Sequence, residues 1–163
     1  MPTRRQVLSM LAAAAATAAI PPVYAAPGTH ARKVHLFSKH LQWLDYGPMA
    51  ETAAKIGFDG IDLTVRPKGH VLPENVERDL PRAVAAIREN GLVADRITVA
   101  ATDPDDPLTL KILETAASLD IGIYRMGWLK YDRDRPIPEQ LDAYRSRMEK
   151  LALLNERLGI HGA

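Results

Sequence analysis

Residues 57–70, GFDGIDLTVRPKGH, constrain the fold more than any other part of the chain. Apolar and polar side chains alternate over residues 61–66, and this two-residue period is that of a β-strand. If the apolar side chains pack against a layer of helices, Asp62, Thr64 and Arg66 must point to the opposite face of the strand. Because an unpaired charge is costly to bury, that face must supply partners for these groups or open onto a polar cavity.

The polar face of this strand has two interpretations. An ion pair between Asp62 and Arg66 near the strand end would satisfy both charges and would be purely structural. Alternatively, the polar side chains border a pocket at the carboxyl end of a parallel strand, where open α/β sheets and barrels bind ligands. The loop that follows adds Lys68 and His70, which favours the pocket.

Strand-like and helix-like segments alternate from residue 33 to residue 163. The predicted strands cover residues 33–38, 61–66, 93–100 and 121–127, a fifth strand begins at 159, and the predicted helices cover residues 48–56, 79–91, 103–119 and 138–158. This alternation predicts an α/β fold whose parallel strands follow one another in the order 1-2-3-4, joined by right-handed crossovers. Two architectures satisfy the pattern: the amino-terminal half of a TIM barrel, or a doubly wound open sheet.

For two of the helices the sequence also predicts how they begin or pack. Asp79 is expected to cap the second helix, with Pro81 in its first turn. An apolar stripe from Leu141 to Leu158 is expected to pack the last helix against the core.

Composition excludes several classes of function. The chain has 21 Lys and Arg against 20 Asp and Glu, so it carries no electrostatic footprint for nucleic acid or for an anionic membrane. It has no cysteine, which removes disulfides and thiolate chemistry. The sequence also lacks the glycine-rich dinucleotide and phosphate-binding loops, HExxH and GxSxG. Histidines and carboxylates must therefore carry any metal or acid–base role.

The amino terminus is typical of an export signal. Arg4 and Arg5 precede an alanine-rich run to Ile20 that is too short to span a membrane as a helix. The paired arginines resemble a twin-arginine signal, with a Sec signal as the alternative, and small residues favour cleavage after Ala25. We therefore predict a signal peptide over residues 1–25, a linker over 26–32 and a folded domain over 33–163. The mature protein is expected in the periplasm or outside the cell, with no membrane attachment.

Three segments resemble exported members of the xylose isomerase-like sugar phosphate isomerase/epimerase family. They are FSKHLQW at residues 37–43, GFDGIDL at 57–63 and YRMGW at 124–128. The resemblance extends from about residue 33 to the end of the chain and implies a TIM barrel with a divalent metal, with Mn, Mg, Zn and Co all left open. In that family the metal ligands lie at the ends of strands five to eight, so none of them is transferred to this chain. A whole barrel of this kind needs about 250 residues.

Four β/α units and the start of a fifth strand are therefore expected, with the catalytic metal site beyond residue 163. On that expectation these residues alone would hold no metal and would be inactive, while a full-length relative would be an isomerase or epimerase.

The candidate substrate-binding residues all lie at or near predicted strand ends. They are His40, Asp62, Arg66, His70, Arg125 and Trp128. A buried arginine in a strand needs an acid or a ligand, which marks Arg125, and Trp128 offers an apolar surface on which a sugar could stack. Thr98 is a further inward-facing position. His40 and His70 have plain alternatives as surface or loop histidines.

The resulting hypothesis is an isomerase or epimerase that transfers a proton beside a carbonyl of a sugar or polyol, aided by a metal. The alternative is a non-catalytic, secreted carbohydrate-binding or truncated module. A DNA-repair nuclease on the same kind of barrel is disfavoured by the balanced charge and the export signal. The expected partner is a small-molecule sugar or polyol, and a homo-oligomer is left open.

Overall fold

The computed structural model describes residues 32–163. The chain divides into two units, Met1–Arg32 and Lys33–Ala163, and the description below concerns the second. The predicted signal peptide and nearly all of the predicted linker lie outside the described residues. Within the described part of the chain, no helix combines the length and the apolar character needed to cross a membrane.

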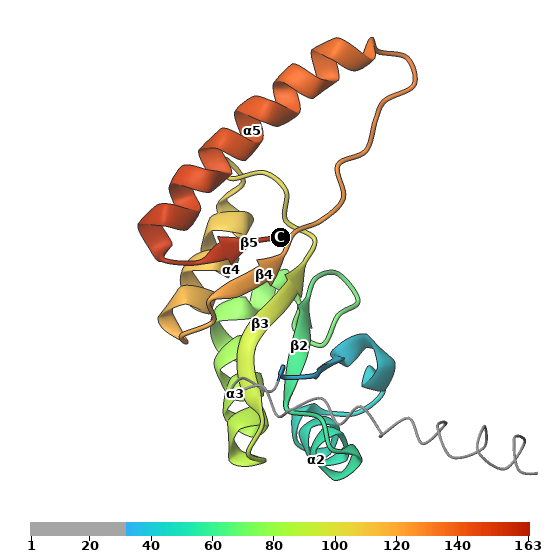
Figure 1. Cartoon of the computed structure of the whole chain (residues 1–163), viewed down its shortest axis with the longest axis vertical. Helices are drawn as coiled ribbons and strands as arrows, with labels where there is room; N and C mark the ends of the chain where they lie inside the picture. Colours follow the sequence, from blue (N-terminus) through green and yellow to red (C-terminus); the bar gives the residue numbers. More distant parts are fainter. Residues whose placement is uncertain (1–31) are drawn as a thin grey trace, which may run out of the picture. The chain divides into compact units, whose positions relative to one another are not determined.

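Strands and helices alternate in the order that the sequence predicts (Figure 1). The elements are β1 (His35–Phe37), η2 (Ser38–Leu41), α2 (Tyr46–Ile56), β2 (Gly60–Val65), η3 (Pro73–Asn75), α3 (Val76–Glu89), β3 (Val93–Val99), α4 (Pro107–Ser118), β4 (Ile123–Arg125), α5 (Ile137–Leu158) and β5 (His161–Gly162). All neighbouring strands are parallel, and their order in the sheet is β1-β2-β3-β4-β5. The predicted strand order is confirmed. Since a doubly wound sheet reverses its strand order at a switch point, the consecutive order is that of a TIM-barrel-like fold.

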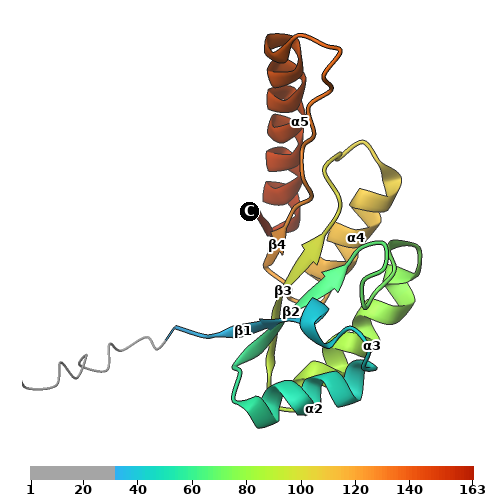
Figure 2. The same cartoon turned by 90° about the vertical axis from the view of Figure 1, so that its right-hand side faces the viewer.

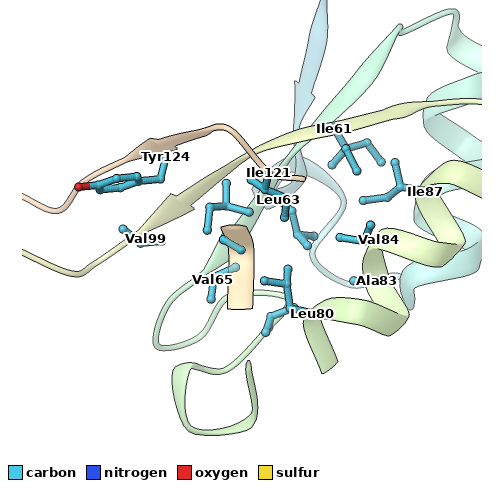
Figure 3. Packing of buried hydrophobic residues seen from close by; sticks show 14 of the residues in the cluster. Ile61, Leu63, Val65, Leu80, Ala83, Val84, Ile87, Val99, Ile121 and Tyr124 are labelled. Atoms are coloured by element: carbon cyan, nitrogen blue, oxygen red, sulfur yellow. The ribbon is translucent and has the colours of Figure 1, made fainter. Parts of the chain in front are cut away.

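The apolar half of the β2 alternation forms the centre of the core. Ile61, Leu63 and Val65 are at most 1% exposed. Figure 3 shows them facing the apolar side of α3, which presents Leu80 and Ile87. The helices therefore cover the face of the sheet that the alternation predicts, and the intervening polar residues of β2 point the other way.

Strand register brings the polar residues of adjacent strands to the same, inner face. Asp62 lies opposite Phe37 of β1, and Thr98 of β3 lies opposite both Thr64 of β2 and Arg125 of β4. Paired residues of parallel strands point to the same side of a sheet. The inner face is thus built from polar or aromatic positions on four successive strands, and β2 contributes two of them, Asp62 and Thr64.

One prediction about the helices is wrong, and another holds only in part. Helix α3 begins at Val76 and not at Asp79, because the 3₁₀ turn of η3 runs directly into it. Asp79 therefore lies inside the first turn, where it pairs with Arg78 and Arg82 instead of capping the helix.

The apolar stripe of α5 is only partly core. Leu151 is 4% exposed, but Leu141 is 44% exposed. Figures 1 and 2 both show the amino-terminal half of α5 extending past the sheet. Helical periodicity alone could not reveal that this helix is longer than the surface on which it packs.

Candidate functional site

A cavity of about 450 Å³ opens at the carboxyl ends of β1 to β4. It is lined by Phe37, Lys39, Arg66, Thr98, Val99, Ala100, Arg125, Met126, Gly127, Trp128 and Lys130. Parallel α/β folds bind their ligands at this edge of the sheet. Three of the six predicted substrate-binding residues, Arg66, Arg125 and Trp128, lie together on its wall.

Arg125 reaches the cavity because its neighbour Tyr124 faces the core. Tyr124 is 1% exposed, and its hydroxyl donates a hydrogen bond of 3.0 Å to Oδ1 of Asn155 on α5. The alternation of the strand then turns Arg125 inward. Its guanidinium carbon lies 5.3 Å from the centre of the Phe37 ring, a cation–π arrangement that orients the charge over β1.

Arg66 is the first residue of a tight turn that closes the end of β2. The Arg66 N–H donates to the Val71 carbonyl (3.1 Å), and the Gly69 N–H donates back to the Arg66 carbonyl (2.8 Å). A Cβ at Gly69 would lie 2.9 Å from the carbonyl oxygens of both Thr64 and Arg66, so the turn leaves room only for glycine. Among residues 32–163, the Arg66 guanidinium donates one hydrogen bond, of 3.3 Å, to the Pro67 carbonyl, and the side chain lines the cavity.

Asp62 lies next to the cavity wall but does not line it. The Thr98 hydroxyl donates to both Asp62 carboxylate oxygens, at 2.8 and 3.0 Å. Burial raises the pKa of Asp62 above its ordinary value, although the Thr98 hydroxyl and the charge of Arg125 act in the opposite direction. The alternative of an Asp62–Arg66 ion pair is wrong: no such pair occurs among residues 32–163.

The two predicted histidines lie outside the cavity lining. His40 is exposed on η2, and its ring stands edge-on to Phe37 at 5.9 Å between centres. His70 is half-buried, and both of its ring nitrogens are shielded from solvent near the backbone of Leu41 and Leu44. Burial lowers the pKa of His70, which favours the neutral ring, although the backbone of Leu41 and Leu44 acts in the opposite direction. His40 therefore touches the wall of the cavity through Phe37, whereas the His70 ring lies against the segment that follows β1.

Sequence reasoning missed two cations of the wall, Lys39 and Lys130. Both follow predicted strands within a few residues, and that position at the carboxyl end is the signal that could have found them.

A second polar group lies further toward the amino ends of the strands. The His35 side chain is 5% exposed, and its Nε2 lies 3.1 Å from Oδ1 of Asp95, which also accepts a 2.8 Å hydrogen bond from Arg96. Burial is the largest influence on the pKa of Asp95 and raises it, but the hydrogen bond and charge of Arg96 outweigh burial and bring the pKa below its ordinary value. Gly60 is required here, because a Cβ would lie 2.5 Å from the His35 ring.

The described residues do not fit the divalent metal that the family resemblance implies. Among residues 32–163, no three His, Asp or Glu side chains come together as a metal-binding group. Asp62 is the carboxylate next to the cavity, and both of its oxygens already accept the Thr98 hydroxyl. We therefore assign no metal ligand and derive no step that passes through a metal.

Comparisons with known proteins agree with the fold. No protein-family model and no curated protein matches the sequence. Among solved structures, the chain is similar to a xylose isomerase-like TIM barrel protein from Mycobacterium smegmatis, solved in complex with magnesium. The TM-score is 0.56 at 14% sequence identity, and the match covers 80% of this chain and 53% of that one.

The fold is that of a TIM-barrel-like α/β protein. At this level of identity the likeness establishes the fold alone. The chain spans about half the length of the solved structure that it matches.

Proposed function

We propose that the protein binds a sugar or polyol in the cavity at the carboxyl ends of β1 to β4, and that it acts in the isomerase/epimerase class. The observation that carries the proposal is the convergence of Arg66, Arg125 and Trp128 on one cavity at the ligand-binding edge of the sheet. The fold shared with a xylose isomerase-like barrel supports the choice of class.

Each wall residue has a binding role that its chemistry permits. The guanidinium groups of Arg66 and Arg125 donate hydrogen bonds to hydroxyl or carbonyl oxygens of the ligand. The Trp128 indole, 83% exposed at the rim, offers a flat apolar surface to the C–H face of a sugar ring. The Thr98 hydroxyl, oriented by Asp62, retains its lone pairs for a ligand hydroxyl. For the described residues the proposal is thus one of binding and orientation.

Tryptophan fluorescence tests the binding site directly, because the chain has only two tryptophans. Trp128 lines the cavity and Trp43, 75% exposed, does not. In the Trp43→Phe variant, a panel of aldoses, ketoses and polyols is expected to include ligands that change the emission. The Trp128→Phe variant serves as the matched control and should not respond. A response carried by Trp43 alone would refute the site.

Proton exchange tests the class of reaction. A bound ketose or aldose incubated in D₂O with Mg²⁺ or Mn²⁺ should lose the NMR signal of the proton beside its carbonyl if the chain acts as an isomerase. Exchange would support the isomerase/epimerase class for these residues. Binding without exchange would leave the binding proposal standing and give the reaction class no support.

We also propose export to the periplasm, from the paired arginines and the alanine-rich run. Intact-mass measurement of the periplasmic protein should show that residues 1–25 have been removed. A mass that retains them would contradict this.

A further inference from the structure

The amino-terminal half of α5 extends past the sheet, and the loop that precedes it forms one side of the cavity. This loop, residues 126–136, leaves the end of β4 and climbs to the far end of α5 (Figures 1 and 2). Near its beginning, Trp128 and Lys130 line the cavity. Residues 131–139 are all exposed, so burial of the loop itself does little to hold these two side chains in place.

One buried side chain ties the loop to the helix. Gln140, near the start of α5, is 3% exposed. Its Oε1 accepts a hydrogen bond of 2.7 Å from the Asp132 N–H, and its Nε2 donates to the carbonyls of Asp132 and Arg135, both at 2.9 Å. Because the amide both accepts from and donates to Asp132, it fixes the path of the loop at that residue. The loss of these buried bonds would leave backbone groups without partners.

Tyr144 makes a second attachment, one helical turn further along α5. Its hydroxyl donates to the Lys130 carbonyl, and its ring lies against that of Tyr131 with 5.7 Å between the centres. Tyr131 thus packs on the helix while Lys130 lies on the cavity wall. The helix is held in turn by Arg147, which pairs at 3.4 Å with Asp103 in the loop after β3.

We propose that Gln140 is a positioning residue, which holds Trp128 and Lys130 on the cavity wall before a ligand arrives and thereby raises the affinity of the site. A loop that is already ordered loses little freedom on binding, so less of the interaction energy is spent on ordering it. The inference rests on the proposed function for the identity of the ligand, whereas the attachment of the loop follows from the contacts of Gln140. This role also gives a reason for the length of α5 beyond the sheet.

Two measurements test the proposal in the full chain that carries Trp43→Phe, in which Trp128 is the remaining tryptophan. Fluorescence anisotropy without ligand reports how freely the Trp128 side chain moves, and it should fall in Gln140→Ala. The second measurement is the Kd of the probe, among glucose, fructose, xylose and xylitol, that changes the Trp128 emission most. Gln140→Ala should raise this Kd by about tenfold, because two side chains must then be immobilised on binding. The matched control is Leu141→Ala, which shortens an exposed side chain on the same turn and should change neither value.

Gln140→Glu separates positioning from a general loss of stability. The carboxylate of this variant cannot donate to the carbonyls of Asp132 and Arg135, so the affinity should be low at about pH 8. A protonated carboxyl has the shape of the amide and offers one donor and one acceptor, so the affinity and the anisotropy should both recover at about pH 5. Gln140→Ala should not recover, and measurements with Gln140 intact at the same pH values correct for other titrating groups.

The outcomes separate this inference from the proposed function. If a probe binds but Gln140→Ala leaves either its Kd or the anisotropy unchanged, the inference is wrong and the carbohydrate proposal stands. The same holds if Leu141→Ala weakens binding as much, or if Gln140→Glu fails to recover at low pH. If no sugar or polyol binds, the carbohydrate proposal is refuted and the anisotropy decides the inference. A fall in Gln140→Ala, reversed by low pH in Gln140→Glu, would then support positioning by Gln140, and an unchanged anisotropy would overturn it.

Discussion

Replacing Gly127 with alanine should destabilise the protein and distort the cavity. Gly127 lies on the cavity wall just after β4, and its N–H donates a 3.0 Å hydrogen bond to the Ala101 carbonyl beyond the end of β3. A Cβ at residue 127 would lie 2.8 Å from the carbonyl carbon of Ala100, closer still to its oxygen, and 3.0 Å from Cγ2 of Thr102. Since the Ala100 group is backbone, no side-chain rotation can relieve the overlap.

The size of the effect follows from that geometry. The Cβ and the Ala100 carbonyl carbon must separate by about 0.6 Å to reach an ordinary 3.4 Å contact, and the nearer carbonyl oxygen requires a larger shift, so the ends of β3 and β4 must move apart. Overpacking of this kind costs about 1–3 kcal/mol of unfolding free energy. With a urea m-value of about 2 kcal/mol/M, the midpoint should fall by about 0.5–1.5 M.

The matched control is Gly122→Ala. Gly122 lies just before the same strand, but a Cβ there would meet nothing within 4 Å, and its φ is not positive. The unfolding free energy of both variants can be measured by urea unfolding followed by circular dichroism. It should fall by about 1–3 kcal/mol for Gly127→Ala and change by no more than about 0.5 kcal/mol for Gly122→Ala. The reasoning fails if the two variants have the same urea midpoint, or if the midpoint of Gly127→Ala equals that of the wild type.

Three further predictions test the core and the inner face. Leu63→Ala should lower the unfolding free energy by about 2–5 kcal/mol, because Leu63 is 1% exposed; a loss below 1 kcal/mol in urea unfolding would contradict its central place. Tyr124→Phe should cost about 1 kcal/mol through the lost hydrogen bond to Asn155, whereas no measurable loss would mean that this bond does not secure α5. Burial raises the pKa of Asp62, so the native state binds its proton more tightly than the unfolded state and stability falls as pH rises from the unfolded pKa through the folded one. As pH rises from 3 to 7, the unfolding free energy of Asp62→Asn should therefore increase relative to that of the wild type. If urea midpoints show that this difference decreases over the same range, the raised pKa is refuted.

The sequence by itself determined the class of fold and the division of β2 into two faces. The alternation over residues 61–66 assigned the apolar side chains to the helices and Asp62 to the inner face, and recurrent helix–turn–strand joints predicted the parallel sheet. These are local signals, since a strand period and a helix exit such as Gly57, with its φ of +100°, are encoded by adjacent residues.

Tertiary structure alone decided which polar residues share a site. Register across four strands joins Asp62 to Thr98, and not to Arg66, and it places Arg125 over Phe37. The turn after β2 leaves Arg66 on the cavity wall but shields the ring nitrogens of His70 from solvent, although the two are only four residues apart. Periodicity specifies the direction of a side chain relative to its own strand. Distances between strands and the path of a turn depend on packing among residues far apart in the sequence, so the basic wall of the cavity emerged only from the folded chain.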